Sequence, residues 1–124
     1  MSVLFKNGTV VTTTGRTTAD VYAENGTIKA IGTRLDPKAQ EVVDCKGKYI
    51  LPGVIDPHTH LAMPFMGTHS QDDFETGTIA AACGGVTSLI DFDLQMKGES
   101  MAQAIERQKK IAGKACIDYA FHLA

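Results

Sequence analysis

The chain has 124 residues, of which 44% are hydrophobic and 21% charged, and its formal net charge is −2. This length is sufficient for one small globular domain with an apolar core. The near-neutral charge, without a basic patch, argues against nucleic-acid and membrane-lipid partners, and no run approaches the roughly 18 apolar residues of a transmembrane helix.

The N-terminus lacks the pattern of a secretory signal peptide. Lys6 and Asn7 interrupt the apolar start, and no small-residue cleavage site follows an apolar core. The three cysteines, Cys45, Cys83 and Cys116, are odd in number and far apart, which fits neither a disulfide framework nor a zinc knuckle. We therefore predict a cytoplasmic protein with reduced thiols.

Residues 1–51 have the pattern of a small all-β segment. Asn25-Gly26 favours a type I′ hairpin turn, because both residues accept a positive φ. Asn7-Gly8 is a second predicted turn, and Lys46-Gly47 is expected to join the last two strands as a pair. No catalytic cluster is apparent in this segment. The expected strands cover residues 3–5, 9–14, 20–23, 27–31, 41–44 and 48–51.

From residue 52 onward, strands and helices alternate. Ser70, with Asp73 three residues later, is the expected start of the first helix, and Gly84-Gly85 its end. This alternation indicates parallel strands with right-handed crossovers, so the predicted fold class is α/β. Strands are expected at residues 54–56, 86–92 and 116–123, a loop at residues 61–69, and helices at about residues 72–82 and 100–113.

Two histidines, His58 and His60, follow the first of these strands. In extended backbone, alternate side chains point to the same face, so the two imidazoles would share a face with Cα atoms about 6.6 Å apart. Neutral imidazole is the commonest metal ligand and suits zinc and similar ions. The pair predicts part of a metal site, since a catalytic zinc needs a third protein ligand and an open position for water. The alternative interpretation is that one ring ends the strand and the other faces solvent.

The residues around this pair resemble a known family. Residues 52–60, which read Pro-Gly-Val-Ile-Asp-Pro-His-Thr-His, are similar to the first barrel strand of the cyclic amidohydrolase superfamily. The segments that narrow the resemblance to the dihydropyrimidinase and D-hydantoinase branch are residues 61–65, 72–78, 80–87 and 117–122. The resemblance implies a small β-sandwich segment in residues 1–51 and the start of a TIM (β/α)8 metallo-hydrolase barrel in residues 52–124. Such a barrel takes about 250 residues, so three of its eight strands predict the N-terminal part of a longer enzyme.

The resemblance implies hydrolytic ring opening of cyclic amides, such as dihydrouracil and 5-substituted hydantoins. His58 and His60 would bind the more buried of two divalent metal ions, which in this family are usually zinc. A carboxylated lysine, two further histidines and an aspartate from later strands would complete the centre. His69 and His122 match no metal ligand of the family. We therefore assign no catalytic residue here, because the aspartate that moves the proton is expected beyond residue 124, and we expect the chain alone to be inactive. The implied assembly is a homotetramer.

The loop after the first strand is implied to contact the substrate. Leu61, Met63, Phe65 and Met66 fall where hydantoinases carry an apolar gate for the ring substituent; the alternative is that they only pack the loop. Ala62 stands where dihydroorotases have an arginine that holds a substrate carboxylate and where many hydantoinases have an aspartate. The substituent preference is therefore left open.

Three carboxylates flank the predicted site. Asp56 precedes the histidines and would either orient them or end the strand. Asp91 and Asp93 are at the end of the second strand, on the face where a polar side chain could take part in catalysis. Two other functions remain: a related cyclic amidohydrolase such as allantoinase, or a non-catalytic dihydropyrimidinase-related protein. Retention of His58 and His60 argues against the latter, whose members have lost this pair. The sequence leaves the substrate, enantiomer, metal and oligomeric state open.

Overall fold

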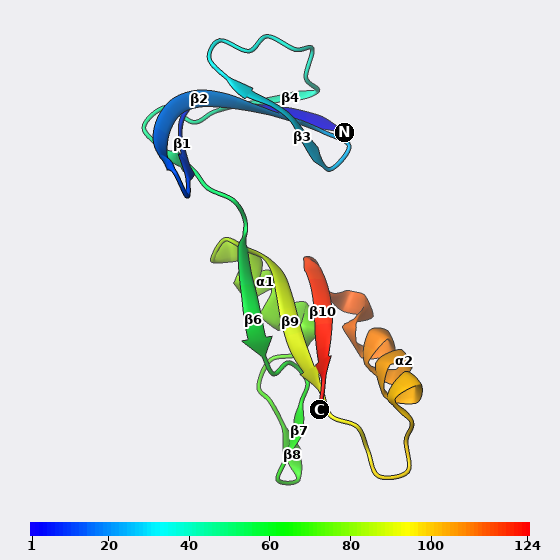
Figure 1. Cartoon of the computed structure of the whole chain (residues 1–124). Coiled ribbons are helices and arrows are strands. Elements are labelled where there is room, and N and C mark those ends of the chain that lie inside the picture. Colours follow the sequence, from blue (N-terminus) through cyan, green and yellow to red (C-terminus); the bar gives the residue numbers. More distant parts are fainter. The chain divides into compact units, whose positions relative to one another are not determined.

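The computed structural model describes all residues, Met1–Ala124, and divides into two compact units, Met1–Pro52 and Gly53–Ala124 (Figure 1). The first unit contains a five-stranded sheet, and the second contains a three-stranded sheet with two α-helices. None of the helices has both the length and the apolar character needed to cross a membrane.

β1 (Ser2–Thr12) is the central strand of the first unit. It pairs antiparallel with β2 (Gly15–Glu24), which pairs antiparallel with β3 (Thr27–Gly32). On its other side β1 pairs in parallel with β4 (Glu41–Asp44) and β5 (Tyr49–Ile50). The predicted β character of this segment is therefore confirmed, but the predicted pairing of the last two strands is wrong, since both add to β1 instead of to each other.

The turn predicted at Asn7-Gly8 is also wrong. Both residues lie inside β1, where the register against β2 shifts between Phe5 and Gly8 and Asn7 has a φ of 62°. Asp20 holds this bulge, because its Oδ1 accepts a hydrogen bond from the backbone N–H of Asn7 at 2.8 Å. A positive φ suits a bulge as well as a turn. The hairpin turn between β2 and β3 is as predicted, with φ values of 50° and 73° at residues 25 and 26.

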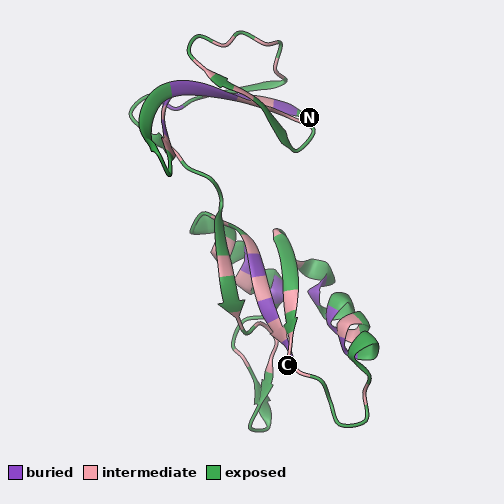
Figure 2. Ribbon diagram, in the orientation of Figure 1, coloured by how far each residue is buried: buried purple, intermediate pink, exposed green.

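The core of the first unit is small. Val10, Ala19 and Val21 are buried together, and Phe5 and Ile50 pack against them. Figure 2 shows the buried residues concentrated on β1 and β2, while much of the remaining sheet is exposed. The large apolar side chains exposed in this unit are Met1, Ile28, Ile31, Val42, Tyr49 and Leu51.

The second unit contains a parallel sheet in the order β10-β9-β6. Its strands are β6 (Val54–Thr59), β9 (Val86–Asp93) and β10 (Asp118–Leu123). The first strand is longer than predicted and continues through His58, while the third begins two residues later than predicted. Within the predicted loop, two short strands form a hairpin, β7 (Pro64–Phe65) and β8 (Thr68–His69).

The two helices connect the parallel strands. α1 (Phe74–Cys83) lies between β6 and β9 in the chain, and α2 (Met101–Ile111), followed by the short helix η1 (Ala112–Lys114), lies between β9 and β10. This parallel strand–helix alternation agrees with the predicted α/β class.

The start predicted for the first helix is wrong. The N-cap of α1 is Asp73, whose side chain accepts from the backbone N–H groups of Glu75 and Thr76, both at 2.9 Å. Thr76 completes a capping box by accepting from the Asp73 N–H, so Ser70 is not needed. The N-cap of α2 is Ser100, the first residue of the range predicted for this helix.

The sheet of the second unit packs its helices on one face. Phe74 of α1, Leu89 of β9 and Ala112 are buried together, and Phe121 of β10 packs against them. Alternate residues of a strand point to opposite faces, so Phe92, at an odd spacing from Leu89, points away from this core. His122 is the β-sheet partner of Phe92 and shares its face.

Candidate metal centre

His58 and His60 converge at the carboxyl end of β6. Their Nε2 atoms are 3.2 Å apart, and their ring centroids are 5.0 Å apart with an interplanar angle of 82°. Both side chains are exposed. The extended backbone that reaches Thr59 gives the two residues a common face, as the His-x-His spacing predicts.

The spacing of the two nitrogens fits a shared ion. Two nitrogens that each lie about 2.0–2.1 Å from one tetrahedral zinc ion are about 3.3–3.4 Å apart. The observed Nε2–Nε2 separation of 3.2 Å is close to this value. No group of three or more His, Cys, Asp or Glu side chains is arranged to hold a metal ion, so the chain offers two ligands of a potential centre.

Asp56 and His122 restrain the backbone before the first ligand. The N–H of His58 donates to Oδ1 of Asp56 at 3.1 Å, so this carboxylate bonds main chain and not an imidazole. The ring of His122 donates from Nε2 to the carbonyl oxygen of Pro57 at 3.0 Å. His122 therefore contacts the strand of the pair through its backbone.

Asp91 restrains the backbone around the second ligand. It is fully buried, and its Oδ1 accepts from Thr59 Oγ1 and from the N–H of Leu61, both at 2.8 Å. Gln108 of α2 donates to its Oδ2 at 3.4 Å. Burial raises the pKa of Asp91 above the usual aspartate value, although the hydrogen bonds from Leu61, Thr59 and Gln108 act in the opposite direction. Asp91 thus fixes the two residues that flank His60.

The expectation that Asp91 and Asp93 face the reaction site is wrong. Asp91 and Asp93 follow Leu89 by two and four residues, so their side chains point to the helix side of β9, as that of Leu89 does. Asp93 is buried and its Oδ1 pairs with Arg107 at 2.9 Å. Arg107 also bonds Glu99 at 3.0 Å, so these charges form an ion-pair network beside α2.

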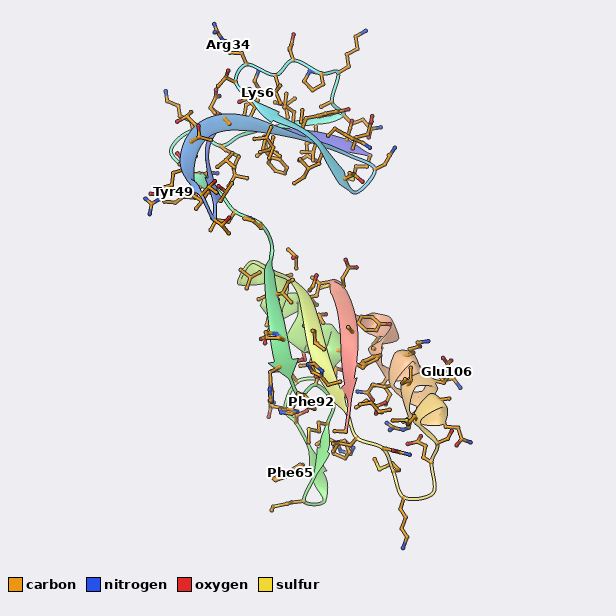
Figure 3. All side chains as sticks on the ribbon, in the orientation of Figure 1. Lys6, Arg34, Tyr49, Phe65, Phe92 and Glu106 are labelled. Carbon is orange, nitrogen blue, oxygen red and sulfur yellow. The ribbon has the colours of Figure 1, made fainter.

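The hairpin after β6 forms one wall of a pocket. The pocket has a volume of about 370 Å³ and is lined by His60, Met63, Phe65, Thr68, His69 and Ser70. Figure 3 shows the labelled Phe65 on this hairpin. His69 lies in the same pocket as His60 but forms no three-residue metal-binding group with the pair.

The four predicted gate residues lie in different environments. Met63 and Phe65 line the pocket, whereas Leu61 packs against the core of the second unit. Met66 is 89% exposed at the tip of the hairpin, where its φ is 47°. The structure therefore brings only two of the four residues to the pocket wall.

Comparison with known proteins gives the family. The model described as "Amidohydrolase family" matches residues 49–122, well over half of the chain. The chain belongs to the amidohydrolase family. This amidohydrolase is 56% identical to a D-hydantoinase of Geobacillus stearothermophilus and 47% identical to a dihydropyrimidinase of Dictyostelium discoideum. The alignments cover 99% of this chain, but 26% and 25% of the two relatives.

Solved structures give the same result. A crystal structure of a D-hydantoinase is 54% identical with a TM-score of 0.94, and a dihydropyrimidinase from Brevibacillus agri NCHU1002 is 52% identical with a TM-score of 0.94. Each match covers 99% of this amidohydrolase and 27% of the other chain. The predicted resemblance to this branch is confirmed, and the chain spans about a quarter of the length of these relatives.

The sequence did not single out Phe92, and it predicted the wrong face of the strand for Asp91. The ring of Phe92 lies 4.6 Å from that of His58 and 5.2 Å from that of His60, measured between centroids. Its alternation with Leu89 is a signal that could have placed it on the face opposite the helices. The sequence could not show that this face of β9 lies beside the histidines, because that depends on pairing between distant strands.

Proposed function

We propose that this amidohydrolase is the N-terminal part of a metal-dependent enzyme that opens cyclic amide rings by hydrolysis. Dihydropyrimidines such as dihydrouracil and 5-substituted hydantoins are the proposed substrates. The observation that carries this proposal is the 56% identity to a D-hydantoinase over 99% of the chain, which includes both His58 and His60. The convergence of their Nε2 atoms at 3.2 Å gives the proposal a chemical basis.

In this proposal residues 1–51 contribute a β-sandwich segment and residues 52–124 the first three strands and two helices of a (β/α)8 barrel. The other metal ligands, including a carboxylated lysine between two ions, are proposed to follow residue 124, as is the aspartate that transfers the proton. We also propose a cytoplasmic homotetramer. These features rest on the resemblance to the hydantoinase branch.

His58 and His60 would hold one divalent ion, and their imidazole nitrogens suit zinc. A bound zinc ion polarises a carbonyl oxygen and lowers the pKa of its water to about 7. The imidazoles must be neutral to donate their lone pairs, so they act as ligands and transfer no proton. Asp56 and Asp91 hold the backbone on either side of the pair.

Met63 and Phe65 are proposed to contact the ring substituent of the substrate. Both line the 370 Å³ pocket that also contains His60, so a substituent bound there would lie near the proposed metal position. Apolar contact at this wall would orient the ring, while Leu61 and Met66 would support the gate from the core and the hairpin tip.

The first test is the intact mass of the purified protein, followed by metal analysis and an assay with dihydrouracil, a 5-substituted hydantoin and allantoin. A chain of 13.3 kDa alone is expected to hydrolyse none of them, whereas a protein several times larger is expected to open dihydrouracil or the hydantoin. Faster opening of allantoin would favour the allantoinase alternative. No turnover by a longer, metal-loaded protein would overturn the proposal.

Replacing either ligand tests the metal assignment. His58→Ala or His60→Ala in the longer protein is expected to lower its metal content and to abolish turnover, because a nitrogen donor is lost from the centre. His69→Ala is the control for metal content alone, since His69 lies outside the converged pair but lines the proposed substrate pocket. Full metal content and full activity in either ligand variant would contradict the assignment.

A further inference from the structure

Phe92 lies among three imidazole rings. Its ring centroid is 4.6 Å from that of His58, 5.2 Å from that of His60 and 4.9 Å from that of His122. The interplanar angles of these contacts are 44°, 38° and 42°, so each imidazole is tilted against the phenyl ring. Figure 3 shows Phe92 near the lower end of β9, beside the carboxyl end of β6.

Packing against the helices does not explain this position. Phe92 belongs to neither buried apolar cluster, and it points away from the helix side where Leu89 and Phe121 pack. Its aromatic neighbours are the three histidines. The phenyl ring therefore lies on the sheet face that carries the ligand pair and contacts both of its rings.

His122 fixes the peptide group that precedes His58. The carbonyl of Pro57 accepts from His122 Nε2 at 3.0 Å, and the N–H of the same peptide group donates to Asp56 Oδ1 at 3.1 Å. Since β9 lies between β10 and β6, the hydrogen bond from His122 spans the central strand, and Phe92 is its partner in that strand. The peptide plane is held at both of its polar ends.

Within Gly53–Ala124 both ligand side chains are exposed, and the ring that both contact is Phe92. Two nitrogens bind one ion only when both rings adopt the converged orientation, and freezing a mobile side chain costs conformational entropy. Contact with the phenyl ring restricts both imidazoles before an ion arrives. We propose that Phe92 and His122 are positioning residues for the pair: Phe92 restricts the two rings, and His122 fixes the peptide that carries His58. This proposal rests on the metal-binding role given to His58 and His60.

The test measures zinc affinity in the whole protein as purified, after removal of metal, by competition with a chromophoric chelator. Phe92→Leu keeps an apolar side chain and removes the ring, and we expect zinc affinity to fall about tenfold or more, as for other residues that orient ligands. Phe121→Leu is the matched control, because this phenylalanine lies on the helix side and contacts Phe74 and Tyr119 instead of the histidines. The zinc affinity of Phe121→Leu is expected to stay within about twofold of the wild-type value. This holds even if thermal unfolding shows that the metal-free variant is less stable than the wild type.

His122 is tested independently. His122→Phe retains an aromatic ring beside Phe92 but removes the donor to Pro57, and zinc affinity is expected to fall by about tenfold. His122→Gln restores an N–H donor and is expected to recover part of the loss. The absorption spectrum of bound Co²⁺ should change in Phe92→Leu and His122→Phe and not in Phe121→Leu, since it reports the geometry of the ligands.

The outcomes separate the two proposals. Wild-type zinc affinity in folded Phe92→Leu and His122→Phe would overturn the positioning role while the metal site stands. Equal zinc affinity in the wild type and in His58→Ala would instead overturn the metal site itself. If Phe92→Leu does not fold, His122→Phe and its glutamine rescue decide the positioning role.

Discussion

Asp20 shows how one buried carboxylate can organise an irregular strand. Its Oδ1 accepts from the Asn7 N–H at 2.8 Å and its Oδ2 from the Leu35 N–H at 2.9 Å, so it joins the bulge of β1 to the chain after β3. The hydrogen bond from Asn7 lowers the pKa of Asp20 most, burial opposes this, and the bond from Leu35 lowers it further. The folded state therefore favours the ionised form.

This shift predicts an acid-sensitive contribution to stability. Because the folded pKa lies below the unfolded value of about 3.9, the stabilisation is complete well above pH 4 and is lost as the pH falls through the folded pKa. Asp20→Asn leaves one N–H without a carboxylate acceptor and is expected to cost about 1–3 kcal/mol at pH 7. Urea unfolding followed at pH 7 and near pH 2.5 should show a smaller difference at the lower pH. Asp36→Asn, at an exposed position in the same loop, is the control; an equal loss in that variant would refute the specific role of Asp20.

The sequence predicted the two metal ligands, but it did not predict the residues that contact and position them. His58 and His60 are recognisable because their spacing of two residues on a strand is local information. Asp91 and Phe92 are neighbours in sequence but act on opposite faces, one through the backbone at Leu61 and the other on the imidazole rings. Which of these contacts forms depends on the register between β6 and β9, and the local sequence does not encode that register.

At the scale of elements, local sequence patterns predicted both helices and the positions of all strands except β7 and β8, which form a hairpin in the predicted loop. The errors arose where one local signal fits two structures: Asn7-Gly8 suits a turn and a bulge, because both need a positive φ. The parallel addition of β4 and β5 to β1 was missed because it joins segments more than 30 residues apart. At the start of α1, Asp73 acts as the N-cap in place of Ser70, since its carboxylate reaches two backbone N–H groups.

α1 also contains a glycine with a packing role. A Cβ at Gly77 would overlap Leu61 Cδ2, and Leu61 leads from β6 into the hairpin. In an exposed helix, replacing glycine by alanine stabilises by about 1 kcal/mol. Here the overlap reverses the sign, and Gly77→Ala is expected to destabilise the second unit by about 1–3 kcal/mol. Thermal unfolding should show a lower midpoint.

Gly113 provides the comparison for this variant. A Cβ at Gly113 meets no atom within 4 Å, and Gly113 is exposed in a short helix, so Gly113→Ala is expected to raise the unfolding midpoint slightly. A second variant, Gly77→Ala with Leu61→Ala, removes the overlap and should recover the part of the loss that comes from the clash. A higher unfolding midpoint in Gly77→Ala alone would show that the helix can move away from Leu61.

At the scale of the whole molecule, the two units have different determinants of stability. Asp20 and the apolar cluster around Val21 belong to Met1–Pro52, whereas the histidine pair and its supporting residues belong to Gly53–Ala124. A ligand stabilises the folded state that it binds, by about 2.7 kcal/mol when its concentration is 100 times the dissociation constant. Zinc should therefore act first on the second unit.

Hydrogen exchange read by mass spectrometry tests this division. Adding zinc to the metal-free protein is expected to slow amide exchange in β6 and β9, because ion binding opposes the opening that separates His58 from Phe92. Exchange in β1 and β2 should stay the same, and a chelator should reverse the change in the second unit. His58→Ala should abolish the response, since one donor is missing. Equal slowing in both units, or a response that survives in His58→Ala, would mean that zinc acts elsewhere than on the converged pair.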